Sequence, residues 1–265
     1  MIKRIKRISN IIQKIRTSDL SEIVGMIKRR LVRKRKIKNY KSYQKLFYNK
    51  CGIEIGGPSS FFNRELPIYQ KIKSLDGVNF SSLTIWEGEL IEGENFKYGR
   101  NKTGYQFICD AVNLDKIESG KYDFVLSCNN IEHIANPFQA LTEWLRVIKK
   151  DGLLLLVVPN KDSNFDHNRK VTTFEHLLKD FKNDTSEEDL THLDEILTLH
   201  DLSMDPPAGD FNNFRKRSLN NFQNRCLHHH VFDLNLLKKI FMYFNIELLL
   251  NDCIKTDFII LGIKK

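Results

Sequence analysis

Glycine and acidic residues follow short apolar segments at intervals that suit the binding of a nucleoside-like cofactor. The apolar stretch Ile53-Glu54-Ile55 runs directly into Gly56-Gly57-Pro58-Ser59. Paired glycines let a backbone turn sharply and approach a ligand closely, although a simple tight turn explains them equally well. Asp76 lies 22 residues beyond Glu54, close to the ~20-residue spacing at which an acid contacts a ribose. A second acid, Asp110, follows the apolar segment Phe107-Ile108-Cys109.

Histidines supply the second set of candidate chemical groups. His133 follows a fourth strand-like segment, and the remaining seven of the eight histidines lie between residues 160 and 245. A neutral imidazole accepts a proton from a nucleophilic hydroxyl, so these side chains are candidate general bases. We assign His133, His200 and His229 as the candidate catalytic residues, with ordinary polar contacts as the alternative. Their spacing matches no recognised metal-binding pattern, so we assign no metal ligand.

Strand-like and helix-like segments alternate along the middle of the chain. Pro137–Lys150 carries apolar residues at helical spacing and stops just before Gly152. Leu153–Val158 is a continuous apolar run, typical of a strand that is buried on both faces of a parallel sheet. This alternation predicts an α/β fold with a doubly wound, mostly parallel, seven-stranded sheet. Two last strand-like segments, Ile246–Leu250 and Phe258–Ile263, predict a terminal antiparallel hairpin.

Composition divides the chain into four predicted parts. Residues 1–48 form a basic, amphipathic helical extension, and residues 49–160 form the cofactor-binding half of the main domain. Residues 161–245 are polar and form a helical cap, and residues 246–265 supply the closing strands. Because ligands bind at the carboxyl edge of open α/β sheets, we expect the cap to lie over that edge.

Positive charge is concentrated at the N-terminus. The net charge is +9, and residues 1–50 hold 17 Lys and Arg against only Asp19 and Glu22. A basic amphipathic helix can lie on an anionic membrane, bind a partner or contact nucleic-acid phosphates. It can also pack on its own domain. Residues 1–40 are therefore the segment that would reach the inner face of the plasma membrane.

Several classes of protein are excluded by composition. The chain has 265 residues, 41% hydrophobic and 28% charged, which is typical of a globular protein. Its longest apolar run is too short to span a bilayer, and the basic N-terminus lacks the apolar region of a secretory signal. Five scattered cysteines form neither a disulfide framework nor a zinc-thiolate site. These features predict a cytoplasmic protein.

Four ordered motifs resemble those of class I S-adenosylmethionine-dependent methyltransferases. They are Glu54-Ile55-Gly56, Asp110-Ala111-Val112-Asn113-Leu114, Tyr122-Asp123-Phe124-Val125-Leu126-Ser127 and Ile131-Glu132-His133-Ile134-Ala135-Asn136-Pro137. The segment 144–155 is similar to the helix that leads into the fifth strand of that family. The resemblance covers residues 50–160 and, more weakly, the last 25. It is closest to the type 11 group of small-molecule enzymes in bacterial surface-polysaccharide biosynthesis.

The resemblance implies S-adenosyl-L-methionine as the cofactor and a role for each matched position. Glu54, Gly56 and Gly57 would face the amino-acid end of the cofactor. Asp76 would hold the ribose hydroxyls, and Asp110 would hold the adenine amine. The full predicted cofactor-binding set is Glu54, Gly56, Gly57, Pro58, Ser59, Asp76, Asp110, Ala111, Ser127, Asn129 and Asn130.

Two positions of the first loop depart from the pattern of that family. Pro58 and Ser60 stand where the family has glycines. Proline has no N–H group and a fixed φ, so this loop must contact the cofactor differently.

Three functions remain open from the sequence. The resemblance favours an O-methyltransferase that acts on a sugar, sugar nucleotide or sugar phosphate in capsule or lipopolysaccharide biosynthesis, with a histidine base. The basic N-terminus suggests a nucleic-acid methyltransferase instead. However, Asn129-Asn130-Ile131-Glu132 differs from the Asn-Pro-Pro-Tyr type of motif used on exocyclic amines, so we expect no nucleic-acid partner. Pro58 and Ser60 are consistent with a non-catalytic module on a degenerate fold. The sequence leaves the oligomeric state open.

Overall fold

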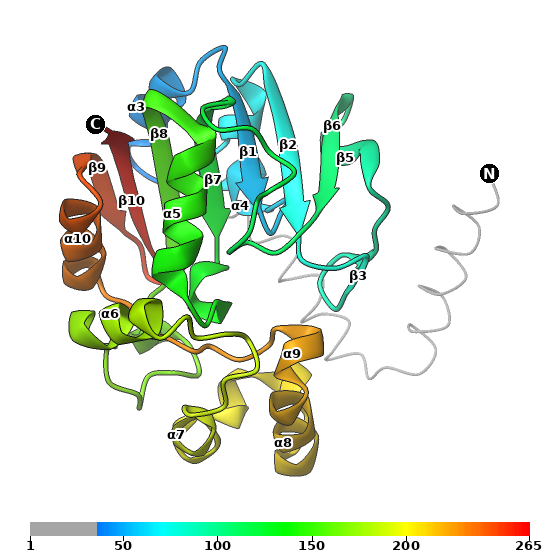
Figure 1. The fold of residues 1–265 in the computed structure, drawn as a ribbon, viewed down its shortest axis with the longest axis vertical. Helices are drawn as coiled ribbons and strands as arrows, with labels where there is room; N and C mark the ends of the chain where they lie inside the picture. The colour runs from blue at the N-terminus through cyan, green and yellow to red at the C-terminus, as the bar shows by residue number, and fades with distance from the viewer. Residues whose placement is uncertain (1–35) are drawn as a thin grey trace. The chain divides into compact units, whose positions relative to one another are not determined.

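Eight strands form the central sheet of the computed structural model, which describes residues 36–265 (Figure 1). They are β1 Cys51–Ile55, β2 Ser74–Asn79, β5 Gly93–Gly99, β6 Lys102–Ile108, β7 Tyr122–Cys128, β8 Ile148–Pro159, β9 Ile246–Cys253 and β10 Asp257–Lys264. Their order across the sheet is β5-β6-β2-β1-β7-β8-β10-β9. Neighbouring strands from β6 to β8 are parallel, whereas the pairs β5–β6, β8–β10 and β9–β10 are antiparallel. The predicted α/β class and terminal hairpin are confirmed.

The sheet has one strand more than the predicted seven. The additional strand, β5, pairs with β6 at the edge of the sheet. Only Phe96 and Tyr98 of β5 are buried, and the rest of this strand is polar or glycine. Its apolar pattern is therefore too short to be read as a strand from the sequence. Strands β3 Leu83–Thr84 and β4 Gly88–Glu89 pair in a separate small sheet.

Both faces of the sheet are buried, because alternate side chains of β8 enter two different cores. Leu154, Leu156 and Val158 belong to one core, which also contains α5 and α10 residues. Leu153, Leu155 and Val157 belong to the other core, together with α3 and α4 residues. The helices are α3 Tyr40–Leu46, α4 Phe61–Arg64, α5 Pro137–Val147, α6 Phe174–Lys182, α7 Leu193–Leu199, α8 Phe211–Leu219, α9 Asn221–Asn224 and α10 Leu234–Tyr243. Short 3-10 helices are η1 Ile68–Gln70, η2 Ile131–His133, η3 Lys161–Ser163, η4 Leu202–Met204 and η5 Pro206–Ala208.

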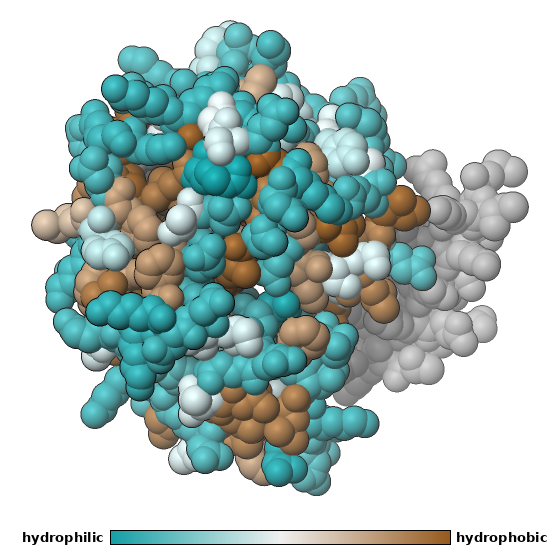
Figure 2. Space-filling view, in the orientation of Figure 1, coloured by the Kyte–Doolittle hydropathy of each residue, from teal (hydrophilic) through white to brown (hydrophobic). Residues whose placement is uncertain are grey.

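A helical cap lies beyond the ends of the parallel strands. In Figure 1, α7, α8 and α9 lie past the arrowheads of β1 and β2, at the carboxyl edge of the sheet. The cap has its own small core of Ile196, Ala208, Phe214 and Leu227. Figure 2 shows a hydrophobic patch over α8 and α9, where exposed apolar residues include Phe211, Leu219 and Phe222.

The main domain begins earlier than the predicted boundary at residue 48. Residues Ile37–Lys265 form one compact unit. Ile37, Tyr43 and Phe47 are buried in the second core, because they pack beneath the sheet as α3 and its flanks. Most of the predicted basic helices, and the segment proposed for membrane contact up to residue 35, lie outside the described residues. Within residues 36–265, no helix is long and apolar enough to cross a membrane.

Candidate active site

The loop after β1 is built around the buried carboxylate of Glu54. The Ser59 amide donates a hydrogen bond to Glu54 Oε1 at 3.0 Å, and the Tyr69 hydroxyl donates to Oε2. A Cβ atom on Gly57 would lie 2.5 Å from Glu54 Oε2, so only glycine fits beside this carboxylate. Gly56 has a φ of 77°, in the left-handed region that favours glycine. Glu54 therefore fixes the path of the loop.

Burial of Glu54 predicts a specific pH dependence of stability. Burial raises the pKa of Glu54 to about 7 from its ordinary value of 4.5, although hydrogen bonds from Ser59 and Tyr69 oppose the rise. The folded protein thus holds this proton more tightly than the unfolded chain does. The associated stability is present below pH 4.5 and is lost as the pH rises towards 7, at about 1.4 kcal/mol per pKa unit.

We therefore expect Glu54→Gln to gain stability relative to wild type between pH 5 and pH 8, by on the order of 2–3 kcal/mol. The measurement is the free energy of unfolding in urea at several pH values. Glu132, whose carboxyl has a similar raised pKa, is unchanged in both proteins and cancels from the difference. Parallel stability curves for the two proteins would contradict the assignment.

Two asparagines at neighbouring strand ends close around this loop. Asn79, the last residue of β2, donates from Nδ2 to the Gly57 carbonyl at 3.1 Å. Asn130 lies just after β7, and a Cβ atom on Gly56 would clash with its side-chain amide. Among the described residues, neither Asn130 Oδ1 nor Ser127 Oγ has a hydrogen-bond partner, and both atoms are buried. Such orphaned polar atoms are the kind that a bound ligand satisfies.

Three other predicted cofactor residues are placed at this edge by their backbone. The Gly57–Pro58 peptide bond is cis. Asn129 has a φ of 48°, and its amide donates to the Val157 carbonyl at 2.9 Å. The Ala111 carbonyl accepts a hydrogen bond from Trp144 Nε1 of α5 at 2.9 Å. The carboxyl ends of β1, β2, β6 and β7 lie at this one edge, because these strands are parallel neighbours in the sheet.

Asp110 lies at the same edge but is paired with the cap. Its Oδ2 lies 2.9 Å from Arg225 Nη2, and its Oδ1 accepts from the Val112 amide at 3.1 Å. Arg225 Nη1 is also 3.1 Å from Glu187 Oε1, and its guanidinium lies over the Phe80 ring, 5.2 Å from the ring centre. Arg225 of the cap therefore binds Asp110, the residue that was expected to hold the adenine amine.

Asp76 is the predicted cofactor residue that the structure does not bring to this edge. It lies in the middle of β2, opposite Ile53. Its Oδ1 accepts from the Tyr105 amide at 2.9 Å and its Oδ2 accepts from the Tyr122 hydroxyl at 2.6 Å. Tyr122 is the first residue of β7, so the carboxylate points away from the carboxyl ends of the strands. Asn79 occupies the strand end in its place.

This placement predicts opposite outcomes for two aspartate variants. Asp76→Ala leaves the Tyr122 hydroxyl and the Tyr105 amide without their partner, so we expect a loss of about 1–3 kcal/mol in the free energy of unfolding. Its dissociation constant for S-adenosylmethionine should stay within about twofold of wild type. Asp110→Ala should weaken binding about tenfold, the equivalent of one hydrogen bond to a charged group. Denaturant unfolding and titration calorimetry on both variants distinguish these roles, and a larger binding loss in Asp76→Ala would reverse the assignment.

His133 lies in η2, directly after β7, and its protonation state is set by its neighbours. Its Nδ1 is 3.0 Å from the Leu227 carbonyl oxygen, so Nδ1 carries the proton and donates it. This leaves Nε2 as an acceptor. Burial, together with the nearby His228, holds the pKa of His133 well below its usual value and keeps the imidazole neutral. The Trp86 ring, from the turn between β3 and β4, lies 5.4 Å away.

Glu132 is a functional candidate that the sequence reasoning did not select. Its carboxylate is buried, and neither oxygen has a hydrogen-bond partner within residues 36–265. Burial raises its pKa to about 7. Side-chain atoms of Glu132, His133 and His228 lie within 4.8 Å of one another. A cavity of about 10 Å³, room for one water, is lined in part by Glu132, Asp166 and His228.

A buried ion network holds His228 beside His133. His228 Nδ1 lies 2.5 Å from Asp166 Oδ2, and Arg169 Nη1 donates to Asp166 Oδ1 at 3.0 Å. Burial lowers the pKa of His228, but the Asp166 carboxylate outweighs this and raises it above the ordinary value. Burial likewise opposes the ionisation of Asp166, but His228 and Arg169 lower its pKa to about 2. The pKa values of His228 and His133 are therefore shifted in opposite directions, that of His228 upward and that of His133 downward.

The other two predicted bases lie inside the cap and are not brought together with His133. The His200 ring stacks 4.3 Å from Phe165 and 4.3 Å from Phe214, and its Nε2 is 3.3 Å from Asp205. His229 is buried, with Nε2 3.0 Å from Asn221 Nδ2 and 3.5 Å from Glu187 Oε2. Because both rings are packed inside the cap and are not brought together with His133, the structure does not support His200 or His229 as the base.

Comparison with known proteins identifies one domain within the chain. Residues 73–156 match the family described as "Methyltransferase domain". This segment runs from the start of β2 through most of β8, and so contains Asp110 and the Glu132–His133 pair. No curated protein matches the chain.

Several solved structures that match the chain are described as methyltransferases. A Thermotoga maritima protein, "SAM-dependent methyltransferase, possible histamine N-methyltransferase", is 16% identical, with 92% of this chain and 97% of that chain covered and a TM-score of 0.45. A putative S-adenosylmethionine-dependent methyltransferase from Listeria monocytogenes is 12% identical, covering 85% and 97%, with a TM-score of 0.49. A SAM-dependent methyltransferase from Aquifex aeolicus is 10% identical, covering 86% and 90%, with a TM-score of 0.46.

Proposed function

We propose that this chain, an S-adenosylmethionine-dependent methyltransferase by its fold and its domain match, methylates a hydroxyl oxygen of a sugar or sugar-linked acceptor. The acceptor would be a sugar, sugar nucleotide or sugar phosphate used to build a bacterial capsule or lipopolysaccharide. One observation carries the proposal. A neutral imidazole, His133, lies beside a buried, unpartnered carboxylate, Glu132, at the strand edge where we place the cofactor.

The residues at this edge fit S-adenosylmethionine. Gly56 and Gly57 leave room for a close approach that a side chain would block. Ser127 Oγ and Asn130 Oδ1 are buried polar atoms without a partner within the described chain. The Asp110 carboxylate, which pairs with Arg225 in this structure, would bind an adenine amine once Arg225 releases it. When bound, the cofactor supplies an electrophilic methyl group on a sulfonium. These residues would bind and orient it.

The proposed reaction needs a base for the acceptor hydroxyl, which is a poor nucleophile at neutral pH. The chain would hold the acceptor oxygen in line with the carbon–sulfur bond of the bound cofactor, which would supply the methyl group while its sulfur kept the electron pair. The hydroxyl proton passes to His133 Nε2. Glu132, within 4.8 Å, would stabilise the resulting imidazolium.

The chemistry around His133 favours a polyhydroxyl acceptor. The two Glu132 oxygens accept hydrogen bonds and have no donors from residues 36–265. Hydroxyl groups of a sugar are donors of that kind. The exposed Trp86, which contacts the His133 ring, offers an aromatic face of the type on which the apolar face of a sugar ring can pack.

The test is an acceptor assay with the full chain. Purified protein is incubated with S-adenosylmethionine in three parallel reactions, which contain sugar nucleotides, sugar phosphates or RNA as the acceptor. We expect the release of S-adenosylhomocysteine and a mass gain of one methyl group on a sugar compound, located on oxygen by NMR. Transfer to RNA, or to a nitrogen atom of the acceptor, would contradict the proposal.

A further inference from the structure

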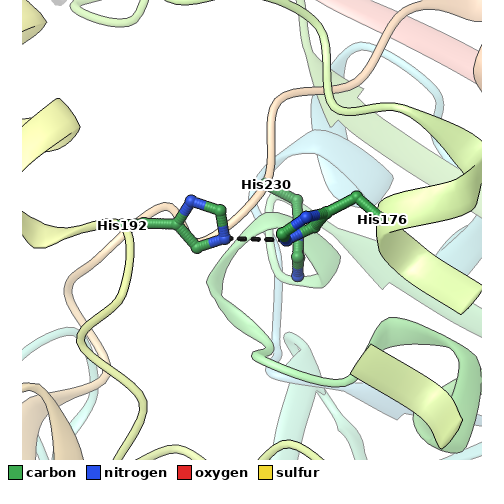
Figure 3. A group of neighbouring side chains, drawn as sticks. All are labelled: His176, His192 and His230. Atoms are coloured by element: carbon green, nitrogen blue, oxygen red, sulfur yellow. Dashed lines mark hydrogen bonds between the residues drawn. The ribbon is translucent and has the colours of Figure 1, made fainter. Parts of the chain in front are cut away.

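Three histidines from separate segments of the cap converge on one point (Figure 3). His176 is in the first turn of α6, His192 precedes α7 and His230 precedes α10. His176 Nε2 and His192 Nε2 are 3.0 Å apart. Figure 3 shows the His192 ring pointing at that of His176, with His230 beside them. Each imidazole offers one nitrogen within 4.8 Å of the other two.

A carboxylate oxygen lies next to two of the three histidines. Asp180 is one helical turn after His176 on α6. Its Oδ2 is 3.1 Å from His176 Nε2 and 3.8 Å from His230 Nε2. This oxygen is buried and forms no hydrogen bond within the described residues, and the same is true of His230 Nδ1.

Hydrogen bonds alone do not satisfy this group. Only one proton can lie between the facing nitrogens of His176 and His192, and it leaves Asp180 Oδ2 and His230 Nδ1 unpaired. A buried polar atom without a partner costs about 1–3 kcal/mol. A divalent cation bound by the lone pairs of all four side chains removes that cost.

The separations between these atoms match a tetrahedral site. Zinc binds imidazole nitrogen at about 2.0–2.1 Å and carboxylate oxygen at about 2.0–2.2 Å, which places tetrahedral ligand atoms about 3.3 Å apart. The two separations that join proposed ligand atoms, 3.0 Å for His176 Nε2–His192 Nε2 and 3.1 Å for His176 Nε2–Asp180 Oδ2, lie close to that value. Three nitrogens and one oxygen also form a donor set that zinc accepts in proteins.

The outer atoms of His230 and Asp180 are held by hydrogen bonds, and that of His192 lies near a carboxylate. His230 Nε2 donates to the Ala135 carbonyl at 3.1 Å, so Nδ1 is the nitrogen that remains available to bind a metal. His192 Nδ1 is 3.7 Å from Glu195 Oε2. The Thr185 hydroxyl donates to Asp180 Oδ1 at 3.3 Å, leaving Oδ2 for the metal. Partners of this kind orient a ligand and raise its basicity.

We propose that His176, Asp180, His192 and His230 form a zinc site that fixes the cap over the strand edge. Four protein ligands close the coordination shell, so the metal is structural and takes no part in methyl transfer. It ties α6, the start of α7 and the segment before α10 together. That last segment also carries His228, so the metal positions the His228–Asp166 pair beside His133.

The test measures metal binding by the full chain without any methyl acceptor, so its outcome is independent of the proposed reaction. Chelator-treated protein is titrated with Zn²⁺, and bound zinc is counted by mass spectrometry. We compare wild type with His192→Ala and with His167→Ala, a cap histidine that pairs with Asp201 outside the cluster. We expect one zinc per chain in wild type and in His167→Ala, and affinity at least about 100-fold weaker in His192→Ala.

Thermal unfolding gives a second measurement on the same samples. Zinc should raise the unfolding temperature of wild type and of His167→Ala but not that of His192→Ala, because binding to the folded state alone stabilises it. Absence of stoichiometric zinc in wild type would overturn the proposal. Equal affinity in wild type and His192→Ala would also overturn it. If His192→Ala still bound one zinc per chain and His133→Gln bound none, the zinc would instead be bound by Glu132, His133 and His228, and the proposal would be overturned.

Discussion

Replacing His133 with glutamine should lower kcat by about 10²- to 10⁴-fold, the range by which a positioned general base accelerates a reaction. Glutamine can still donate to the Leu227 carbonyl, which His133 Nδ1 faces at 3.0 Å. It has no nitrogen lone pair to accept the proton of a hydroxyl. The loss should therefore appear in kcat, with the dissociation constant for S-adenosylmethionine nearly unchanged.

The matched control is His167→Gln, the same substitution at a cap histidine whose partner is Asp201. We expect it to keep wild-type turnover. Steady-state kinetics with saturating cofactor makes the comparison. Full turnover in His133→Gln would remove His133 as the base.

Glu132 adds a pH signature to the same prediction. Since Glu132 has a pKa of about 7 and must be ionised to stabilise the His133 imidazolium, kcat/KM of wild type should fall as the pH drops through 7. Glu132→Gln should be slower and should lose that limb of the profile. If kcat/KM of Glu132→Gln still fell as the pH dropped through 7, the titration would belong to a group other than Glu132.

Replacing Gly56 with alanine should weaken binding of S-adenosylmethionine by at least about tenfold. Gly56 has a φ of 77°, and a Cβ atom there would clash with the Asn130 side-chain amide. The loop and Asn130 must then move apart, which breaks the edge proposed to hold the cofactor. Tenfold corresponds to about 1.4 kcal/mol of binding free energy.

Gly120→Ala separates this effect from backbone strain. Gly120 has a similar φ of 65°, but no atom lies within 4 Å of its added Cβ, and it precedes the amino end of β7. Both variants should lose about 1–2 kcal/mol of stability from left-handed strain. Only Gly56→Ala should lose cofactor affinity by calorimetry. Equal affinities in the two variants would place the cofactor away from this loop.

The fold was predictable because its signals are local. Leu153–Val158 is apolar on both faces, and it became the buried part of β8. The periodic segment Pro137–Lys150 became α5, which ends at Val147. Strand β5 was missed because only two of its side chains are buried.

The error at Asp76 has a different cause. The number of residues between Glu54 and Asp76 gives their separation in the sequence, but it does not say where along strand β2 Asp76 lies. Between β1 and β2 lie two short helices, α4 and η1, so β2 starts only at Ser74 and its carboxyl end falls at Asn79. The residue at the expected spacing is therefore in mid-strand, facing Tyr122.

The histidine clusters could not be predicted from spacing at all. His228 and its partner Asp166 are 62 residues apart, and His176 and His230 come from opposite ends of the cap. Such pairs depend on how the cap folds back on itself. The sequence supplied the residue types, but their grouping required the structure.

A crystal structure of the full chain with S-adenosylhomocysteine tests the central claim most directly. We predict the amino-acid end of the ligand at Gly56–Gly57, its adenine beside Asp110, and its sulfur on the side of Asn130 and His133. Arg225 would either pack against the adenine or release Asp110. Ligand bound elsewhere, or an edge that stays closed by Arg225 at saturating ligand, would contradict the account.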